Sequence, residues 1–158
     1  MTFNSKRTIT SMVTGVVLMI GYLIYALGEK APALGDIKSW AISMLIFIGI
    51  AVGVQIIIMI LFQILYAVGV AVKERDKSDA EVERIIESTV YEDERDKLIS
   101  LKSNLVGNII GGIGVVGALV LLALGYSVPL SLNVILLAYF SGTIIEGCVS
   151  IYHYERGV

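Results

Sequence analysis

Charged side chains are scarce in this 158-residue chain: they make up 16% of the sequence, whereas hydrophobic residues make up 56%. A soluble globular domain carries about 25% charged residues, so this composition excludes that class and indicates a membrane protein. Cys148 is the only cysteine, which excludes an intramolecular disulfide. The net charge of −2 gives no overall basic character, so direct binding of nucleic acid is not expected.

Residues that carry out catalysis or bind metals are also few. The single histidine, His153, falls near the end of an apolar run, and no triad of serine or cysteine with histidine is identifiable. His153 with Glu146 and Cys148 lacks the further ligands of a metal site, and the acidic run at 92–96 lacks the spacing and the glycine of an EF-hand. We therefore expect no enzyme activity, no metal and no cofactor.

Long apolar runs dominate what the chain does contain. A helix needs about 20 apolar residues to cross a hydrocarbon core about 30 Å thick. Four runs are this long, at 9–28, 39–72, 105–126 and 130–152. The sequence predicts an all-α integral membrane protein, whose four transmembrane helices form two hairpins joined by a charged cytoplasmic helical hub. The corresponding division of the chain is 1–72, 73–104 and 105–158.

The basic residues predict the orientation of these helices. Lys6 and Arg7 precede the first run and Arg156 follows the fourth, whereas only Lys30 and Lys38 lie in the first hairpin loop. Seven of the 12 basic residues lie between the second and third runs: Lys73, Arg75, Lys77, Arg84, Arg95, Lys97 and Lys102. The positive-inside rule then puts both termini and the hub in the cytoplasm. Basic residues before an apolar run also fit a signal peptide, but this run is longer than the core of one.

The second run is longer than a bilayer requires. As one helix, 39–72 would extend about 51 Å at 1.5 Å per residue, so 64–72 are expected to project into the cytoplasm, where other protein must cover them. The capping pair Ser78 and Glu81 begins a short amphipathic pattern that can cover one side. A second hub helix is expected to begin in the acidic run and to continue into the third span.

Small residues mark two candidate contact surfaces. Residues 112–117 match the phosphate-binding pattern G-x-G-x-x-G, but they lie inside a span and no acidic residue follows about 20 positions later. At helical spacing, one face of the third span instead gathers Gly107, Gly111, Gly114 and Ala118, which favours close helix packing. Gly49 and Gly53 form a similar pair on the second span. With the projecting Val68, they predict a homodimer through a twofold interface.

Glu146 is the only acidic residue well inside a predicted span. An ionised group in hydrocarbon costs about 2.5–3.5 kcal/mol, so it should face protein or water. Asn108 lies at a similar depth in the third span, and Gln55 and Gln63 on the second span could face the same layer. The sequence leaves two readings open, a proton or cation site and a hydrogen bond between helices.

The run before the third span carries a resemblance. Asp93, Glu94 and Arg95, with Ile99 and Lys102 following, resemble a group of small prokaryotic four-span membrane proteins of unknown function. In that group an acidic Asp-Glu-Arg motif precedes a glycine-rich helical hairpin, often encoded beside helix-turn-helix regulators. The resemblance covers about a quarter of the chain. It implies a prokaryotic cell membrane and a cytoplasmic regulatory protein as partner, and it implies no reaction.

Two functions follow from these features. The first is a non-catalytic oligomeric membrane protein whose long second helix and hub, including Asp93, Glu94 and Arg95, form a cytoplasmic interaction platform. The alternative is a small ion- or proton-coupled transporter or channel that uses Glu146. The sequence alone gives neither the partner nor the transported species.

Overall fold

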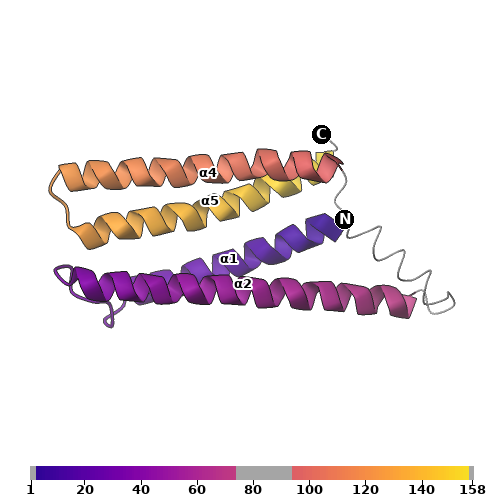
Figure 1. Cartoon of the computed structure of the whole chain (residues 1–158), viewed down its shortest axis with the longest axis horizontal. Helices are drawn as coiled ribbons and strands as arrows, with labels where there is room; N and C mark the ends of the chain where they lie inside the picture. The colour runs from indigo at the N-terminus through magenta and orange to yellow at the C-terminus, as the bar shows by residue number, and fades with distance from the viewer. Residues whose placement is uncertain (1–2, 74–93, 157–158) are drawn as a thin grey trace.

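The computed structural model describes residues 3–73 and 94–156, and these residues form four helices (Figure 1). They are α1 (Phe3–Leu27), α2 (Ile37–Lys73), α4 (Glu94–Ala123) and α5 (Val128–Arg156). Each is long and apolar enough to cross a membrane. The described part of the chain is therefore all-α, and the protein is a multi-pass membrane protein, as the apolar runs predict.

All four helices begin before the predicted apolar runs. α1 begins at Phe3, before the predicted start, because the Phe3 ring packs on Phe62 and Tyr66 of α2 at centroid distances of 5.5 and 4.4 Å. α4 begins at Glu94 and continues without a break into the membrane, as expected for the second hub helix. The helix therefore crosses the predicted boundary at 104. The expected amphipathic helix after Ser78 lies outside the described residues.

α2 is one unbroken helix of 37 residues, which corresponds to about 55 Å at 1.5 Å per residue. Asp36 caps its start: the backbone N–H of Ser39 donates to Oδ1 at 3.0 Å and the Ser39 hydroxyl to Oδ2 at 2.6 Å. Both hydrogen bonds lower the pKa of the exposed Asp36 carboxyl, and the bond from the hydroxyl contributes most. The far end of α2 reaches past the other helices in Figure 1.

The helices form two layers, with α4 and α5 above α1 and α2 in Figure 1. α4 packs along α5, α5 also packs against α1, and α1 packs against α2. Contact between α2 and α5 is slight. Both termini lie at one end of the bundle, together with the start of α4, and both hairpin loops lie at the other. We call these the terminal end and the loop end.

Glycines bring α4 and α5 close together. A Cβ added at Gly114 would overlap the Cβ of Ala138, and a Cβ at Gly142 would lie 2.7 Å from the carbonyl oxygen of Gly107. The buried residues of α4 include Gly107, Gly111, Gly114 and Ala118, which is the predicted small-residue face. Close backbone approach compensates for the missing hydrophobic drive between helices in lipid.

The turn between α4 and α5 requires its glycine. Gly125 has a φ of +84°, in the left-handed region that favours glycine. Its N–H donates to the carbonyl of Leu122 at 3.0 Å, and the N–H of Tyr126 donates to Leu121 at 3.0 Å. This is the Schellman pattern, which satisfies the last carbonyls of a helix. It ends α4 and directs α5 back along it.

An aromatic core closes the loop end of the bundle. Tyr22, Trp40 and Met44 are buried there, and Phe47, Leu132 and Leu136 pack around them. The Tyr22 hydroxyl donates to Oδ1 of Asn133 at 2.5 Å, so α1 and α5 are joined by a polar bond inside the apolar cluster. This core therefore joins α1, α2 and α5 at the loop end.

Substituting two neighbouring glycines of α4 tests the close packing. Gly114→Ala should lower the free energy of unfolding by about 1–3 kcal/mol, because the added methyl group overpacks the contact with Ala138. Gly112→Ala is the matched control, since its added methyl would meet no atom within 4 Å. Alanine should raise helix stability there by about 0.5–1 kcal/mol. Unfolding in detergent measures both, and equal effects would contradict the packing described.

Candidate functional site

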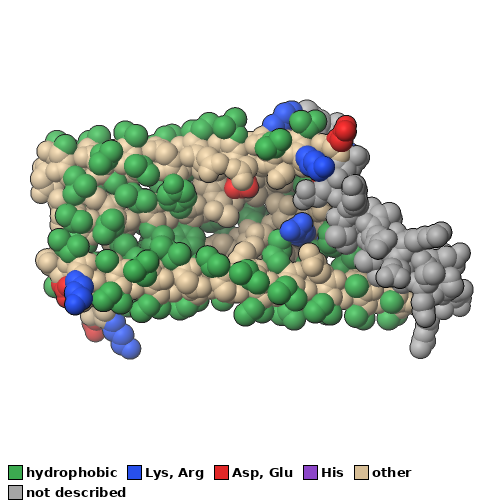
Figure 2. Space-filling view, in the orientation of Figure 1, with side chains coloured by type: hydrophobic (Ala, Val, Ile, Leu, Met, Phe, Trp, Pro, Cys, Tyr) green, Lys and Arg blue, Asp and Glu red, His purple; other side chains and the backbone are tan. Residues whose placement is uncertain are grey.

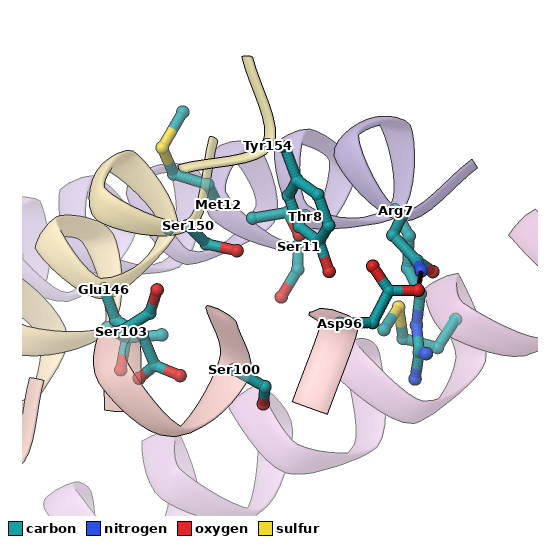
Figure 3. A pocket seen from close by; sticks show the side chains of 14 residues that line it. Arg7, Thr8, Ser11, Met12, Asp96, Ser100, Ser103, Glu146, Ser150 and Tyr154 are labelled. Carbon is teal, nitrogen blue, oxygen red and sulfur yellow. Dashed lines mark hydrogen bonds between the residues drawn. The ribbon is translucent and has the colours of Figure 1, made fainter. Parts of the chain in front are cut away.

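A cavity of about 260 Å³ opens between α1, α4 and α5 toward the terminal end (Figure 3). Its lining is mostly polar although it lies among membrane-spanning helices. The polar side chains that line it are Asn4, Arg7, Thr8 and Ser11 of α1, Asp96, Ser100 and Ser103 of α4, and Thr143, Glu146, Ser150 and Tyr154 of α5. Water and polar ligands therefore have a place inside the bundle.

Helical spacing explains why these side chains meet. Residues three, four and seven positions apart lie on one face of a helix. Each of the three helices has such a polar face: Asn4, Thr8 and Ser11 on α1; Asp96, Ser100 and Ser103 on α4; Thr143, Glu146 and Ser150 on α5. The cavity forms where these three faces converge.

Glu146 supplies the charge deepest in the cavity. It lies roughly 15 Å before the end of α5 at 1.5 Å per residue, and its side chain is half-buried. A Cβ on Gly107 would come within 2.9 Å of its Oε2 atom, so the carboxylate rests where α4 has no side chain. Within the described ranges, Glu146 makes no hydrogen bond or ion pair. Its charge is therefore available to a ligand.

Ser103 lies one helical turn from Gly107 and also lines the cavity. Only 1% of this residue is exposed, and its hydroxyl oxygen has no hydrogen-bond partner. Buried hydroxyl groups in native proteins are nearly always hydrogen-bonded, because an unpaired one costs about 1–3 kcal/mol. The Ser103 hydroxyl is therefore an unpaired polar group beside the cavity.

The mouth of the cavity carries charges of both signs. The side-chain amide of Asn4 donates to Oδ2 of Asp96 at 2.7 Å, which connects the start of α1 to the start of α4. Arg7 lies at the same end as Asp96, while Glu146 and Ser103 lie at the opposite end of the view in Figure 3. Because Arg7 offsets Asp96, the cavity keeps one net negative charge, that of Glu146.

Gly147 allows α1 to pack closely against α5 beside Glu146. A Cβ added there would lie 3.1 Å from the Cβ of Met12. Together with Gly107 on the other side, it allows both neighbouring helices to approach α5 beside Glu146. The small residues thus set the width of the cavity at its charged end.

The predicted polar partners of Glu146 do not line this cavity. Asn108 is exposed, and its amide donates to Oδ1 of Asn104 on its own helix. Gln63 is exposed on α2. Gln55 donates to the hydroxyl of Ser11, so it supports the lining from behind. The reason is rotational: Asn108 follows Gly107 by one position and therefore points about 100° away from it.

The predicted interaction surface divides into two parts. Gly107, Gly111 and Gly114 are buried against α5, so α5 of the same chain already covers them. Gly49 and Gly53 would meet nothing within 4 Å if a Cβ were added, so they stay open. Val68 is 54% exposed, and Glu94 and Arg95 are exposed in the first turn of α4. Asp93 lies outside the described residues.

Sequence reasoning missed most of the cavity lining. Asn4, Thr8, Ser11, Ser100, Ser103 and Ser150 were not among the candidates. The signal that could have found them is the recurrence of hydroxyl and amide residues at helical spacing in three spans, always toward the terminal end. Within the described ranges, no three His, Cys, Asp or Glu side chains gather as a metal site.

Comparisons with family models, with curated proteins and with solved structures give no match. What the chain does must therefore be inferred from its own residues and their arrangement. The lining offers two carboxylates, those of Asp96 and Glu146, several hydroxyl groups and the side-chain amide of Asn4. Such groups can bind a cation or exchange a proton.

Thiol labelling tests whether the cavity contains water. In a Cys148→Ser background, Thr143→Cys should react with a charged thiol reagent, because a thiolate forms only where water reaches it. Ile145→Cys is the matched control: it lies on the same helix and is 41% exposed, but it does not line the cavity. Equal reaction at both positions would show that the cavity does not distinguish them.

Proposed function

We propose that this protein binds a small cation, or exchanges a proton, at Glu146, as a small membrane transporter or binding protein would. One observation supports this most: a carboxylate among membrane-spanning helices has no partner in the described chain and borders a polar cavity. Of the two functions that the sequence suggests, the cavity favours the one that uses Glu146.

Energies support a cationic ligand. Placing a charge in a span costs about 2.5–3.5 kcal/mol on insertion scales. A unit charge about 4 Å away returns about 4 kcal/mol at an effective dielectric constant of about 20. A bound cation therefore offsets the cost of keeping Glu146 ionised, and the Ser103 hydroxyl can orient toward it.

The loop end sets what transport would require. The Tyr22, Trp40 and Met44 core closes the bundle there, so of the two ends of the bundle only the terminal end gives access to the site. Passage to the other side requires α1 and α5 to separate at the hydrogen bond between Tyr22 and Asn133. A protein that only binds its ligand needs no such step.

We further propose that the terminal end faces the cytoplasm of a prokaryotic cell, with the protein in the plasma membrane. The excess of Lys and Arg at that end supports this orientation. Under it, the cavity opens to the cytoplasm. The labelling experiment extends to orientation: Lys97→Cys should react only from the cytoplasmic side and Ala33→Cys only from outside, and the reverse would overturn the assignment.

Neutralising the carboxylate tests the proposed site. Glu146→Gln should weaken binding of tetramethylammonium, a probe cation, at least tenfold, since the charge is lost while the shape is kept. Glu155→Gln is the matched control, because Glu155 is an exposed acid on the same helix outside the cavity lining. Equilibrium binding to the full chain in detergent measures both. Undiminished binding to Glu146→Gln would remove Glu146 from the site.

A second function, the oligomeric platform, is favoured by the end of α2. Leu65, Val68 and Val72 are 70%, 54% and 66% exposed there, and this end extends past the other helices. Each apolar side chain left in water forgoes about 1.5–3 kcal/mol of burial. Cover by a second copy through a twofold contact supports a homodimer, and a cytoplasmic regulatory protein is the other candidate.

Native mass spectrometry from mild detergent tests the homodimer. The wild type should appear as a dimer and Val68→Glu as a monomer, because a carboxylate is buried at the contact only at a high cost. Gln63→Glu adds the same charge about 140° around the helix at 3.6 residues per turn, and it should keep the dimer. A wild-type monomer, or a dimer that persists in Val68→Glu, would contradict the interface.

A further inference from the structure

A second cavity, of about 180 Å³, lies between α2 and α5. Its lining is mainly apolar and includes Ile48 and Ala51 of α2 with Leu136 and Phe140 of α5. We call it the apolar groove. Nothing in the proposed binding of a small cation uses it.

The apolar groove adjoins the polar cavity. Thr143 lines both. On α5, the path from Glu146 through Thr143 to Leu136 covers roughly 15 Å at 1.5 Å per residue. A carboxylate, a hydroxyl group and an apolar surface therefore follow one another along a single helix.

The bundle is open on the side between α2 and α4. α4 packs along α5 and α2 contacts α5 only slightly, and within the described residues the contact between α2 and α4 is at most marginal. Figure 2 shows a hollow between the two layers, with an acidic side chain visible inside it and hydrophobic side chains along both rims. A molecule dissolved in the bilayer can reach both cavities through this side.

We propose that the natural ligand is an amphipathic cation, with its ammonium group at Glu146 and its apolar part in the apolar groove. This inference rests on the proposed function and names its ligand class. Charge complementarity supports the cationic end, because Glu146 is unpaired and Arg7 lies at the mouth with Asp96. A simple hydrated ion would make no favourable contact with the apolar groove, and Glu146 would repel an anionic headgroup.

Size restricts the class further. The two cavities together lie near the lower end of the roughly 300–1,000 Å³ that small-molecule pockets occupy. This suits a single-tailed or compact ligand. The hydroxyl group of Thr143, which lines both cavities, lies where the polar and apolar parts of such a ligand would join.

Two probes that share one headgroup test the inference. The full chain in a maltoside detergent is titrated with tetramethylammonium and with dodecyltrimethylammonium, and binding to Glu146→Gln is subtracted as background. The wild type should bind the dodecyl probe at least about tenfold more tightly, because each buried methylene contributes about fourfold. Ala51→Phe fills the groove and should reduce this preference below about threefold, with tetramethylammonium binding unchanged.

Matched variants keep the test decisive. Ile50→Phe adds the same ring at an exposed neighbour outside both cavities and should keep the tenfold preference. If Ala51→Phe also loses tetramethylammonium, the variant is misfolded, and Val52→Phe, which enters the same groove, decides instead.

The remaining outcomes separate the two proposals. Equal wild-type affinity for both probes would overturn the amphipathic ligand and leave Glu146 as a simple cation site. Absence of Glu146-dependent binding of either probe would overturn the proposed function itself. A groove variant that keeps the tenfold preference but changes the mass of the oligomer would assign the groove to a second copy and overturn this inference.

Discussion

The near contact of two backbones determines the rest of this structure. Because Gly107 and Gly142 lack side chains, α4 and α5 approach until a Cβ on Gly142 would lie 2.7 Å from the carbonyl of Gly107. Glu146, one turn after Gly142, then lies against the backbone of α4 rather than in lipid. With larger residues at these positions the helices would separate, and the carboxylate would lose the wall that shields it. The polar cavity thus depends on residues that carry no polar side chain.

Much of the fold follows from composition and spacing. The length of the apolar runs predicts the four spans. Hydrocarbon offers no hydrogen-bond partners, so a single apolar segment must form a helix to pair its own backbone N–H and C=O groups. The small-residue face of α4 follows from three- and four-residue spacing, and in the structure this face is buried against α5. The long α2 follows from a run, 39–72, that no charged residue and no proline interrupts.

The cavity could not be predicted in the same way. Hydroxyl residues are common in membrane helices because they bond to their own backbone, as Thr14 does to the carbonyl of Thr10 at 2.9 Å. Thr143 makes the same kind of bond to Tyr139 at 3.1 Å, yet it also lines both cavities. The presence of hydroxyl residues in a span therefore does not reveal which helix faces converge to form a cavity. That depends on the rotation of each helix about its axis, and a shift of one position separates the exposed Asn108 from the buried Gly107.

The position of α5 in the bundle has a consequence for biosynthesis. α1 and α2 enter the membrane first, but the core that holds them at the loop end is completed by Leu132 and Leu136 of α5. α4 pairs with α5 across a short turn, so this hairpin closes a small loop at little entropic cost. Until it docks, Tyr22 has no acceptor in Asn133 and the polar face of α1 has no opposite wall. The polar cavity is therefore complete only after the last helix has inserted, because α5 supplies one of its walls.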